Sequence, residues 1–498
     1  MSIPKLFVAL DMPQPDEWLY KNSNYHPGIG FKVNLDAITQ GYLYDLMEMT
    51  KPINNLCIFL DYKMNNGVRT MGSILRDLIR YDRHIIVTVH LSVGVAALKE
   101  LQEIIADSKV LLFGVGALTH YDDDDTMSMY NLKYDALCKK FADITVDAGI
   151  AGMIVPGSQL GHLREYTFNK ITPGIYVHGV NNTNQKHQVT PTEAYMQGAH
   201  AIVVGRAIYS AANPIQAAAD IFIESNTARD IIDSACLIVN NGAVEIRADN
   251  EEPFVYSSGN RGPGYIMVKG LVGRPGLIEG LIELLVRRIT GPDFPEFDFI
   301  AANATGGMIP GWEIQRQLNA KDLTIPFVYI RGTRKIAGHG ELITGDRNNP
   351  YIQPGMKALI VEELVNYAET TCNSALVLRE AGYIADHATC ILSYDHEDQR
   401  SNLTKQGVTL HPLVTLPQVL EVARSERLMD TKALDSYEAY LADPIAWQVD
   451  RGLVVPEETA DKAVASGKYT CPSATDYNGA PQGQVNNEVK YYRLSKIE

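Results

Sequence analysis

The chain has 498 residues, which at roughly 100 to 200 residues per domain predicts two or three domains. With 46% hydrophobic and 21% charged residues, the composition excludes collagen-like, disordered and disulfide-scaffold proteins. The formal charge of −15 works against a broad surface for a phosphate backbone, so we expect no nucleic-acid partner.

The cysteines and the apolar segments indicate the cellular compartment in which the protein is expected. The six cysteines are scattered and form no C-x-x-C pair, which is typical of a chain without a disulfide framework or a zinc site. The N-terminus lacks a basic segment followed by an apolar one, and no run of about 18 apolar residues occurs. We therefore expect a cytoplasmic protein with no membrane partner and no bound metal.

Residues 1–225 repeat one pattern, in which a short apolar run is followed by a turn and then by a stretch with helical spacing. Runs that are rich in Val and Ile and alternate with helices are typical of strands buried on both faces of a parallel sheet. Eight such runs predict a closed (β/α)8 TIM barrel in an α/β protein. They are residues 6–11, 28–34, 56–63, 85–90, 110–117, 152–156, 171–175 and 199–208.

The pattern changes after a helical linker at about residues 215–234. Residues 226–450 predict a second α/β domain, because helical stretches separate new apolar runs in an order that favours an open, mostly parallel sheet. Residues 451–498 follow as a C-terminal extension. The strands expected in the second domain are residues 297–302, 327–331, 358–363 and 388–394.

Charged side chains follow the second and third strands of the predicted barrel. Asp61 and Lys63 are two residues apart in a strand, so both face the same side, and Lys32 on the preceding strand completes an alternating row. Such a row costs desolvation energy unless its charges are paired, so it marks function more than stability, although a plain buried salt bridge is the alternative. Other polar residues at strand ends, where barrel enzymes build their sites, are Asp11, His90, Thr119 and Arg206.

The segment after the third strand reads Asp61-Tyr62-Lys63-Met64-Asn65-Asn66-Gly67-Val68-Arg69-Thr70. Together with Lys32 it resembles the orotidine 5′-phosphate decarboxylase family, which carries a Lys on the second strand and D-x-K-x-x-D-x-x-x-T after the third. The resemblance extends in order to the family's remaining strand ends and phosphate loops. The matching residues there are Asp11, His90, Thr119, Thr172 to Ile175, Gln185, Gly205 and Arg206.

That resemblance implies a reaction. Lys63 would protonate the C6 carbanion left when orotidine 5′-monophosphate (OMP) loses CO2 to become UMP, while Asp61 would press against the substrate carboxylate. Lys32 would belong to the same catalytic row, and no metal or organic cofactor is implied. In that family, the residues aligned with Asn66 and Thr70 reach into the active site of the partner subunit, which implies a homodimer or a dimer-based tetramer. The residues implied in substrate binding are Asp11, Thr70, Thr119, Gln185, Gly205 and Arg206.

Asn66 departs from the family pattern, which has an Asp there. An amide keeps hydrogen-bonding capacity but lacks the negative charge that would orient Lys63 and repel the departing carboxylate. One interpretation is a slower decarboxylase whose Asp61 carries the electrostatic effect. The others are a nucleotide-binding or assembly protein that has lost catalysis, and a different reaction on another phosphorylated sugar or nucleotide.

The second half carries an acidic pair, Glu362 and Glu363, together with three further motifs. With residues 256–261, Ala304-Thr305-Gly306-Gly307 and a basic stretch that includes Arg334, Lys335 and His339, it resembles type I orotate phosphoribosyltransferases. In some bifunctional UMP synthases that domain follows the decarboxylase. The resemblance implies that phosphoribosyl pyrophosphate (PRPP) with Mg²⁺, and orotate, would be substrates of an active second domain.

Several ligand-contacting positions of that second half depart from the family. Residues 365–370 read Val-Asn-Tyr-Ala-Glu-Thr where the family has a glycine-containing phosphate loop, and Glu369 would repel a phosphate. Ser257 stands where the family has a Lys, and His396 where it has an Arg. We therefore expect a UMP-synthase-like enzyme of de novo pyrimidine biosynthesis whose transferase half is impaired or altered.

Overall fold

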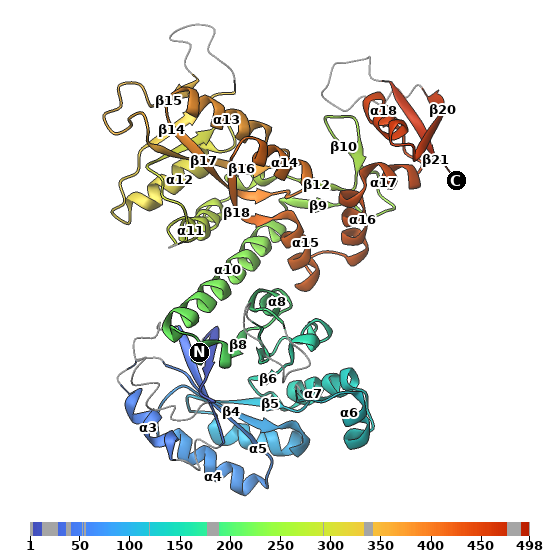
Figure 1. Cartoon of the computed structure of the whole chain (residues 1–498). Coiled ribbons are helices and arrows are strands. Elements are labelled where there is room, and N and C mark those ends of the chain that lie inside the picture. Colours follow the sequence, from blue (N-terminus) through green and yellow to red (C-terminus); the bar gives the residue numbers. More distant parts are fainter. Residues whose placement is uncertain are drawn as a thin grey trace. The chain divides into compact units, whose positions relative to one another are not determined.

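The computed structural model describes residues 3–11, 28–35, 41–51, 53, 56–118, 120–176, 189–291, 293–332, 342–475 and 490–497. The chain divides into two compact units, Met1–Arg229 and Asp230–Glu498, and the boundary falls inside helix α10 (Pro214–Asn240), which covers the predicted linker (Figure 1). Within the described ranges, no helix has both the length and the apolar composition that crossing a membrane requires.

The first unit contains a closed barrel of eight parallel strands, which confirms the predicted fold. The barrel closes where Leu6 of the first strand pairs with Ile202 of the last. The strands are short and nearly all of their residues are buried, as expected of a sheet covered by helices on its outer face. They are β1 (Leu6–Ala9), β2 (Ile29–Asn34), β3 (Ile58–Met64), β4 (Ile85–His90), β5 (Val110–Val115), β6 (Gly152–Ile154), β7 (Asn169–Thr172) and β8 (Ala201–Val204).

Inward-pointing side chains fill the barrel toward the amino ends of its strands. Phe7 and Phe59 pack edge to face with ring centroids 5.4 Å apart, and both are buried. A side chain at Gly30 would collide with the Phe7 ring at 2.6 Å, so a glycine is required beside it. Because inward positions alternate along a strand, the next inward residues after Gly30 and Phe59 are Lys32 and Asp61. These two therefore lie one layer nearer the carboxyl ends of the strands.

The eighth strand is shorter than the sequence predicts. It ends at Val204, and the polar segment that follows turns into the short helix α9 (Arg206–Tyr209) after Gly205. The other helices of the barrel are α3 (Tyr42–Met49), α4 (Val68–Ile79), α5 (Val95–Ile105), α6 (Asp123–Tyr130), α7 (Tyr134–Ala148) and α8 (Pro191–Met196), with short 3-10 turns η1 (Leu91–Val93), η2 (Gly157–Gln159) and η3 (Gly161–Leu163).

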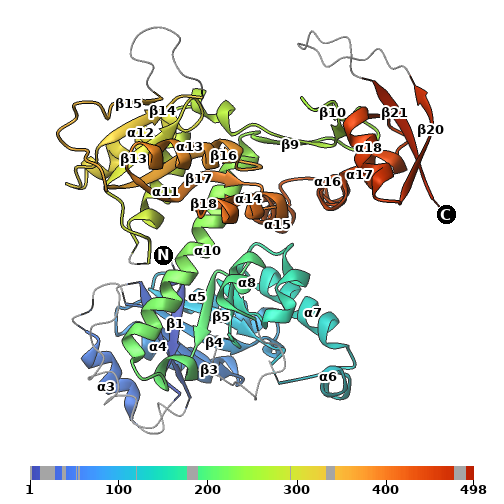
Figure 2. The same cartoon turned by 45° about the horizontal axis from the view of Figure 1, so that its top comes forward.

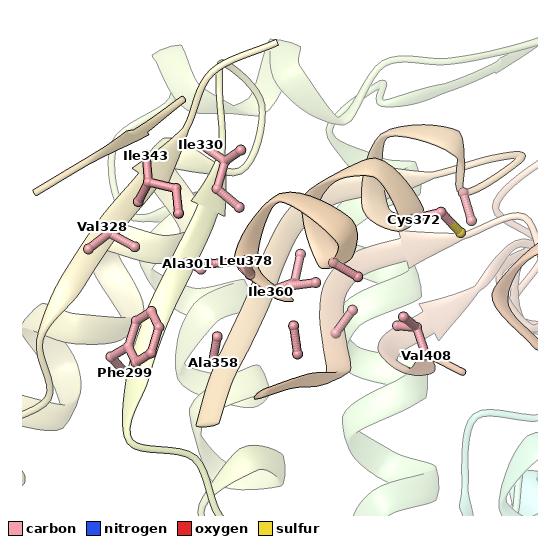
Figure 3. Close-up of a cluster of buried hydrophobic side chains, with 14 of the residues drawn as sticks. Phe299, Ala301, Val328, Ile330, Ile343, Ala358, Ile360, Cys372, Leu378 and Val408 are labelled. Atoms are coloured by element: carbon pink, nitrogen blue, oxygen red, sulfur yellow. The ribbon is translucent and has the colours of Figure 1, made fainter. Parts of the chain in front are cut away.

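The second unit is built on a six-stranded sheet in the order β15-β14-β13-β16-β17-β18. Only β15 is antiparallel to its neighbour, which confirms the mostly parallel sheet. Figure 3 shows Phe299, Ile360 and Leu378 in the apolar cluster that joins the sheet to helix α13 (Glu369–Glu380). The strands are β13 (Phe299–Asn303), β14 (Phe327–Ile330), β15 (Ile343–Thr344), β16 (Lys357–Val365), β17 (Ile384–Ser393) and β18 (Thr409–Thr415).

The remaining described elements of the second unit are helices and three small sheets. The last described residues form an antiparallel sheet, β19-β21-β20, against which α18 packs (Figure 2). Its strands are β19 (Val455–Pro456), β20 (Tyr469–Thr475) and β21 (Tyr491–Lys496), and two ribbons pair β9 (Val244–Ile246) with β12 (Gly264–Ile266) and β10 (Phe254–Val255) with β11 (Arg261–Gly262). The helices are η4 (Val268–Gly273), α11 (Leu277–Ile289), α12 (Met308–Asn319), α14 (Glu397–Lys405), α15 (Leu416–Ser425), α16 (Thr431–Ala442), α17 (Pro444–Asp450) and α18 (Glu457–Ala465).

Candidate active site

Four charged side chains form a continuous row at the carboxyl ends of β1, β2 and β3. Lys32 Nζ lies 3.2 Å from Asp11 Oδ2 and 3.5 Å from Asp61 Oδ2. Lys63 Nζ lies 2.7 Å from the same Asp61 oxygen. The structure thus brings together the alternating row of anions and cations that strand periodicity predicts.

Two uncharged residues that the sequence analysis did not single out complete this network. Asn34 Oδ1 accepts a hydrogen bond from Lys32 Nζ at 2.6 Å, and the Thr88 hydroxyl donates to Asp61 Oδ1 at 3.0 Å. Asn34 is two residues beyond Lys32 on β2, so strand alternation could have found it. Thr88 lies on β4, and only the pairing of distant strands brings it to Asp61.

The electrostatics of the row favour an ionised Asp61. Burial by itself would raise the pKa of this carboxyl, but the Lys32 and Lys63 ammonium groups and the hydrogen bonds from Lys63 and Thr88 outweigh it, so the pKa is lowered from its usual value of 3.8. Lys32 is only 7% exposed, so its charge acts on Asp61 with little screening by water. Asp61 therefore carries a fixed negative charge at neutral pH.

A cavity of about 540 Å³ opens above this row. The charged row lines one part of it, and Gly205 and Arg206, at the start of α9, line another. Gly205 packs closely, since a Cβ there would lie 3.3 Å from Ala9 Cβ. A cavity with a charged row and a separate cation is suited to an anionic ligand with two polar ends. The remaining lining residues include Asn34, Phe59, Ala117, Leu118, His120, Ile154, Pro156, Pro173, Gly174, Ile175 and Tyr209.

Other predicted residues of the barrel site lie elsewhere or outside the described part of the chain. Asn66 and Thr70 are exposed, after β3 and at the start of α4, and neither is among the described residues that line the cavity. His90 accepts a hydrogen bond from Ser92 N–H and caps η1. Thr119 and Gln185 lie outside the described residues.

In the second unit, the acidic pair Glu362 and Glu363 lies in the second half of strand β16. Glu362 is 7% exposed and accepts a hydrogen bond from Asn303 Nδ2, and Asn303 in turn accepts one from the Ser374 hydroxyl. Burial and the neighbouring Glu363 carboxylate raise the Glu362 pKa to about 7, against the Asn303 and Lys269 contributions, which lower it. Glu362 therefore keeps its proton to a higher pH than an exposed glutamate does.

The Gly306-Gly307 turn is shaped by the residues packed against it. A Cβ at Gly306 would lie 1.5 Å from Glu363 Oε2, and one at Gly307 would lie 2.0 Å from the Val361 carbonyl oxygen. No side chain fits at either position. Glu363 also pairs with Lys269 at 3.3 Å, so its carboxylate lies between this turn and an exposed ammonium group. Thr305, before the two glycines, is exposed.

The segment 365–370 is packed against His396 at the start of α14. The His396 ring lies 4.7 Å from the Tyr367 ring, its Nδ1 accepts the Gln399 N–H, and its Nε2 therefore donates to Asn366 Oδ1 at 2.9 Å. Burial lowers the pKa of His396, which leaves it neutral. Glu369 occupies the first turn of α13, where the helix dipole would otherwise favour a phosphate.

The remaining predicted residues of the transferase-like site are not brought to the acidic pair by any described contact. Ser257 is exposed in the turn between β10 and β11. Arg334, Lys335 and His339 lie outside the described residues.

Replacing Glu362 by Gln should remove a pH dependence of stability. Because the folded-state pKa of about 7 exceeds the usual 4.5, the folded state binds the proton more tightly, and stability should fall as pH rises from about 4.5 to about 7. The full fall would be on the order of 3 kcal/mol. Calorimetric unfolding of the full chain at several pH values should show this slope for the natural protein and for exposed Glu380→Gln, but not for Glu362→Gln. Equal slopes in all three proteins would refute the assignment.

Comparisons with known proteins bear on both units. Residues 4–221 match the model of the "Orotidine 5′-phosphate decarboxylase / HUMPS family". Orotate phosphoribosyltransferase from Sinorhizobium fredii is 32% identical over 212 residues, which cover 42% of this chain and 86% of that protein. The chain belongs to the orotate phosphoribosyltransferase family. The Ruegeria sp. enzyme of the same name is 32% identical over 217 residues, 43% of this chain and 91% of its own length.

The two matches together make this chain a UMP-synthase-like fusion of a decarboxylase-family domain with a phosphoribosyltransferase-family domain. Among solved structures, UMP synthase from Leishmania donovani is similar at 20% identity and a TM-score of 0.37, covering 88% of this chain and 97% of its own.

Proposed function

We propose that the first unit converts OMP to UMP and CO2, as one step of pyrimidine biosynthesis. The observation that carries the proposal is the row Asp11-Lys32-Asp61-Lys63 in a cavity that Arg206 also lines. The match of residues 4–221 to the decarboxylase family supports it. The chain is therefore an enzyme, a carboxy-lyase in its first unit.

The chemistry needs a fixed anion next to a proton donor. Asp61, held ionised by two lysines, would face the substrate carboxylate and destabilise it by like-charge repulsion. The C–C bond to that carboxylate breaks, CO2 leaves, and the electron pair remains on C6. Lys63, with its ammonium nitrogen 2.7 Å from Asp61 Oδ2, then donates a proton to C6.

The other residues would bind the substrate away from the reacting carbon. Asp11 would contact the ribose, and Gly205 and Arg206, with Gln185, would hold the 5′-phosphate. Lys32 would remain in the charged row beside Asp61. Binding energy from such a remote group can accelerate the reaction when it orients the reacting end for the transition state. The decarboxylation itself needs no cofactor, since the protein's own groups supply both the charge and the proton.

Asn66 and Thr70, exposed on one subunit, would reach the site of a second subunit, so the proposal includes a homodimer or a dimer-based tetramer. With Asn66 in place of a carboxylate, the reaction would depend on Asp61 alone for electrostatic repulsion. A catalytically inactive nucleotide-binding protein on the same folds is the second candidate, and the neutral Asn66 favours it. The proposal includes a cytoplasmic location, because the scattered cysteines form no C-x-x-C pair.

The second unit would act on orotate and PRPP, with Mg²⁺ bound to the pyrophosphate of PRPP. Glu363 would be the carboxylate available to the ribose hydroxyls, whereas Glu362 is buried and accepts from Asn303. The Tyr367–His396 contact and Glu369 lie in the segment where the resemblance expects the 5′-phosphate loop, and they would hinder the binding of a phosphate there. We therefore propose a transferase half that is impaired or altered.

The proposal is tested by assaying the full chain with each half-reaction's substrates. OMP alone should give UMP, followed by absorbance, and orotate with PRPP and Mg²⁺ should give OMP more slowly than OMP is consumed. No UMP from OMP, together with no thermal stabilisation by UMP, would refute the proposal. Stabilisation by UMP without turnover would instead establish the nucleotide-binding candidate, because a ligand that binds only the folded state raises the melting temperature.

A further inference from the structure

Strands β3 and β4 lose their regular pairing beside the charged row. Leu60 pairs with Val87, and the next paired residues are Met64 and Val89. Three residues of β3 therefore stand opposite Thr88 alone, and such a bulge interrupts the ladder of backbone hydrogen bonds. Lys63 lies within the bulge and has a φ of 47°, a left-handed conformation that lysine rarely adopts.

The Thr88 side chain bonds to both ends of this irregular segment. Its hydroxyl oxygen accepts the Lys63 backbone N–H at 2.8 Å, and its hydroxyl hydrogen is donated to Asp61 Oδ1 at 3.0 Å. A hydroxyl can donate and accept at once, so one atom fulfils both roles. Thr88 is 0% exposed, so water does not compete for these bonds.

The two oxygens of Asp61 are thereby held from different directions. Thr88 binds Oδ1, whereas Lys63 and Lys32 lie at Oδ2. The same Thr88 hydroxyl holds the backbone from which the Lys63 side chain starts. The positions of the proton donor and of the anion are therefore tied to one side chain on the neighbouring strand.

We propose that Thr88 is a positioning residue for decarboxylation, fixing the Lys63 backbone and the Asp61 carboxylate relative to each other. Thr88 itself would not touch the substrate, and it is not among the described residues that line the cavity. The inference rests on the proposed function of the first unit and adds to it a residue that acts through Lys63 and Asp61.

The test compares Thr88→Val, which keeps the shape and removes the hydroxyl, with Thr88→Ser, which keeps the hydroxyl. Thr88→Val should lower kcat by about tenfold to a hundredfold, the effect of a small misplacement of reacting groups. KM and the dissociation constant of UMP should stay within about threefold, because the phosphate and ribose contacts remain. Thr88→Ser should restore kcat to within about threefold of the natural protein.

A pH profile separates positioning from a general loss of stability. The charged groups that face Asp61 are Lys32 on β2, Lys63 on β3 and, through Lys32, Asp11 after β1. Losing the Thr88 donor removes a hydrogen bond that favours the ionised carboxyl, so the acid limb of the kcat profile should move to higher pH in Thr88→Val.

Thr145→Val is the matched control, because Thr145 is also fully buried in the first unit and its hydroxyl donates to the Phe141 carbonyl within α7. It should leave kcat and the pH profile unchanged. If Thr88→Val does not fold, Thr88→Cys, with a weakly hydrogen-bonding thiol, should show the same direction of change. An active natural protein whose Thr88 variants keep kcat and the acid limb would overturn this inference alone. A natural protein that does not decarboxylate OMP would overturn the proposed function and this inference with it.

Discussion

Lys63→Ala is expected to reduce decarboxylation of OMP by at least about a thousandfold, since a positioned proton donor contributes about 10² to 10⁴ in rate and the partner of Asp61 is lost as well. In the structure, Lys63 Nζ is 2.7 Å from Asp61 Oδ2 and its side chain is 38% exposed, so it is paired but still open to the cavity. The measurement is kcat from the loss of OMP absorbance at saturating substrate. UMP binding should persist, because the proposed phosphate contacts are elsewhere.

Lys51→Ala is the control for this experiment. Lys51 is also a lysine of the first unit that pairs with one carboxylate, Glu48 at 3.6 Å, but its side chain is 72% exposed. Its removal should leave kcat unchanged, because exposed ion pairs contribute little. If Lys63→Ala kept a tenth or more of the natural kcat while folded, Lys63 could not be the proton donor and the assignment of the site would fail.

Asn66→Asp is expected to increase the decarboxylation rate by about tenfold to a hundredfold. A hydrogen bond to a charged group contributes about 1.5 to 3 kcal/mol, and each 1.36 kcal/mol removed from the barrier is a factor of ten. The added carboxylate would orient a lysine ammonium group and repel the substrate carboxylate. The increase should appear in kcat more than in KM, since the charge acts on the reacting end of the substrate.

Asn65→Asp is the matched control, because it adds the same charge one residue earlier, also at an exposed position after β3. A rate increase in Asn66→Asp but not in Asn65→Asp would show that position 66 specifically reaches an active site. If the residue acts across a dimer, mixing natural subunits with subunits that carry both Lys63→Ala and Asn66→Asp should raise kcat per natural subunit, because one site of each mixed dimer combines a natural Lys63 with the new carboxylate. An equal effect of both Asp substitutions would point to general electrostatics and contradict the proposed role of residue 66.

The secondary structure could be predicted where the pattern is local. Buried strands of a parallel sheet are short apolar runs, and such runs in the first 225 residues correspond to the eight strands of the barrel. The predicted end of the eighth strand is wrong, because Ile208 is apolar but belongs to α9 rather than to β8. An apolar residue is buried equally well by a strand or by a helix, so hydrophobicity alone does not place that boundary.

The sequence by itself indicated the charged row, because side chains two residues apart in a strand face the same side and Asp61 and Lys63 have that spacing. The left-handed backbone of Lys63 in an irregular part of β3 was decided by the tertiary structure. The sequence could not determine Thr88, which meets Asp61 across 27 positions of the chain and only where the β3–β4 pairing is irregular. Nor could it determine that His396 binds Asn366 and packs on Tyr367. These contacts join residues that are distant in the chain, and a hydrogen bond of that kind leaves no periodic pattern. Only the packing of the strands and helices selects the partners, because each buried polar group must find one within reach.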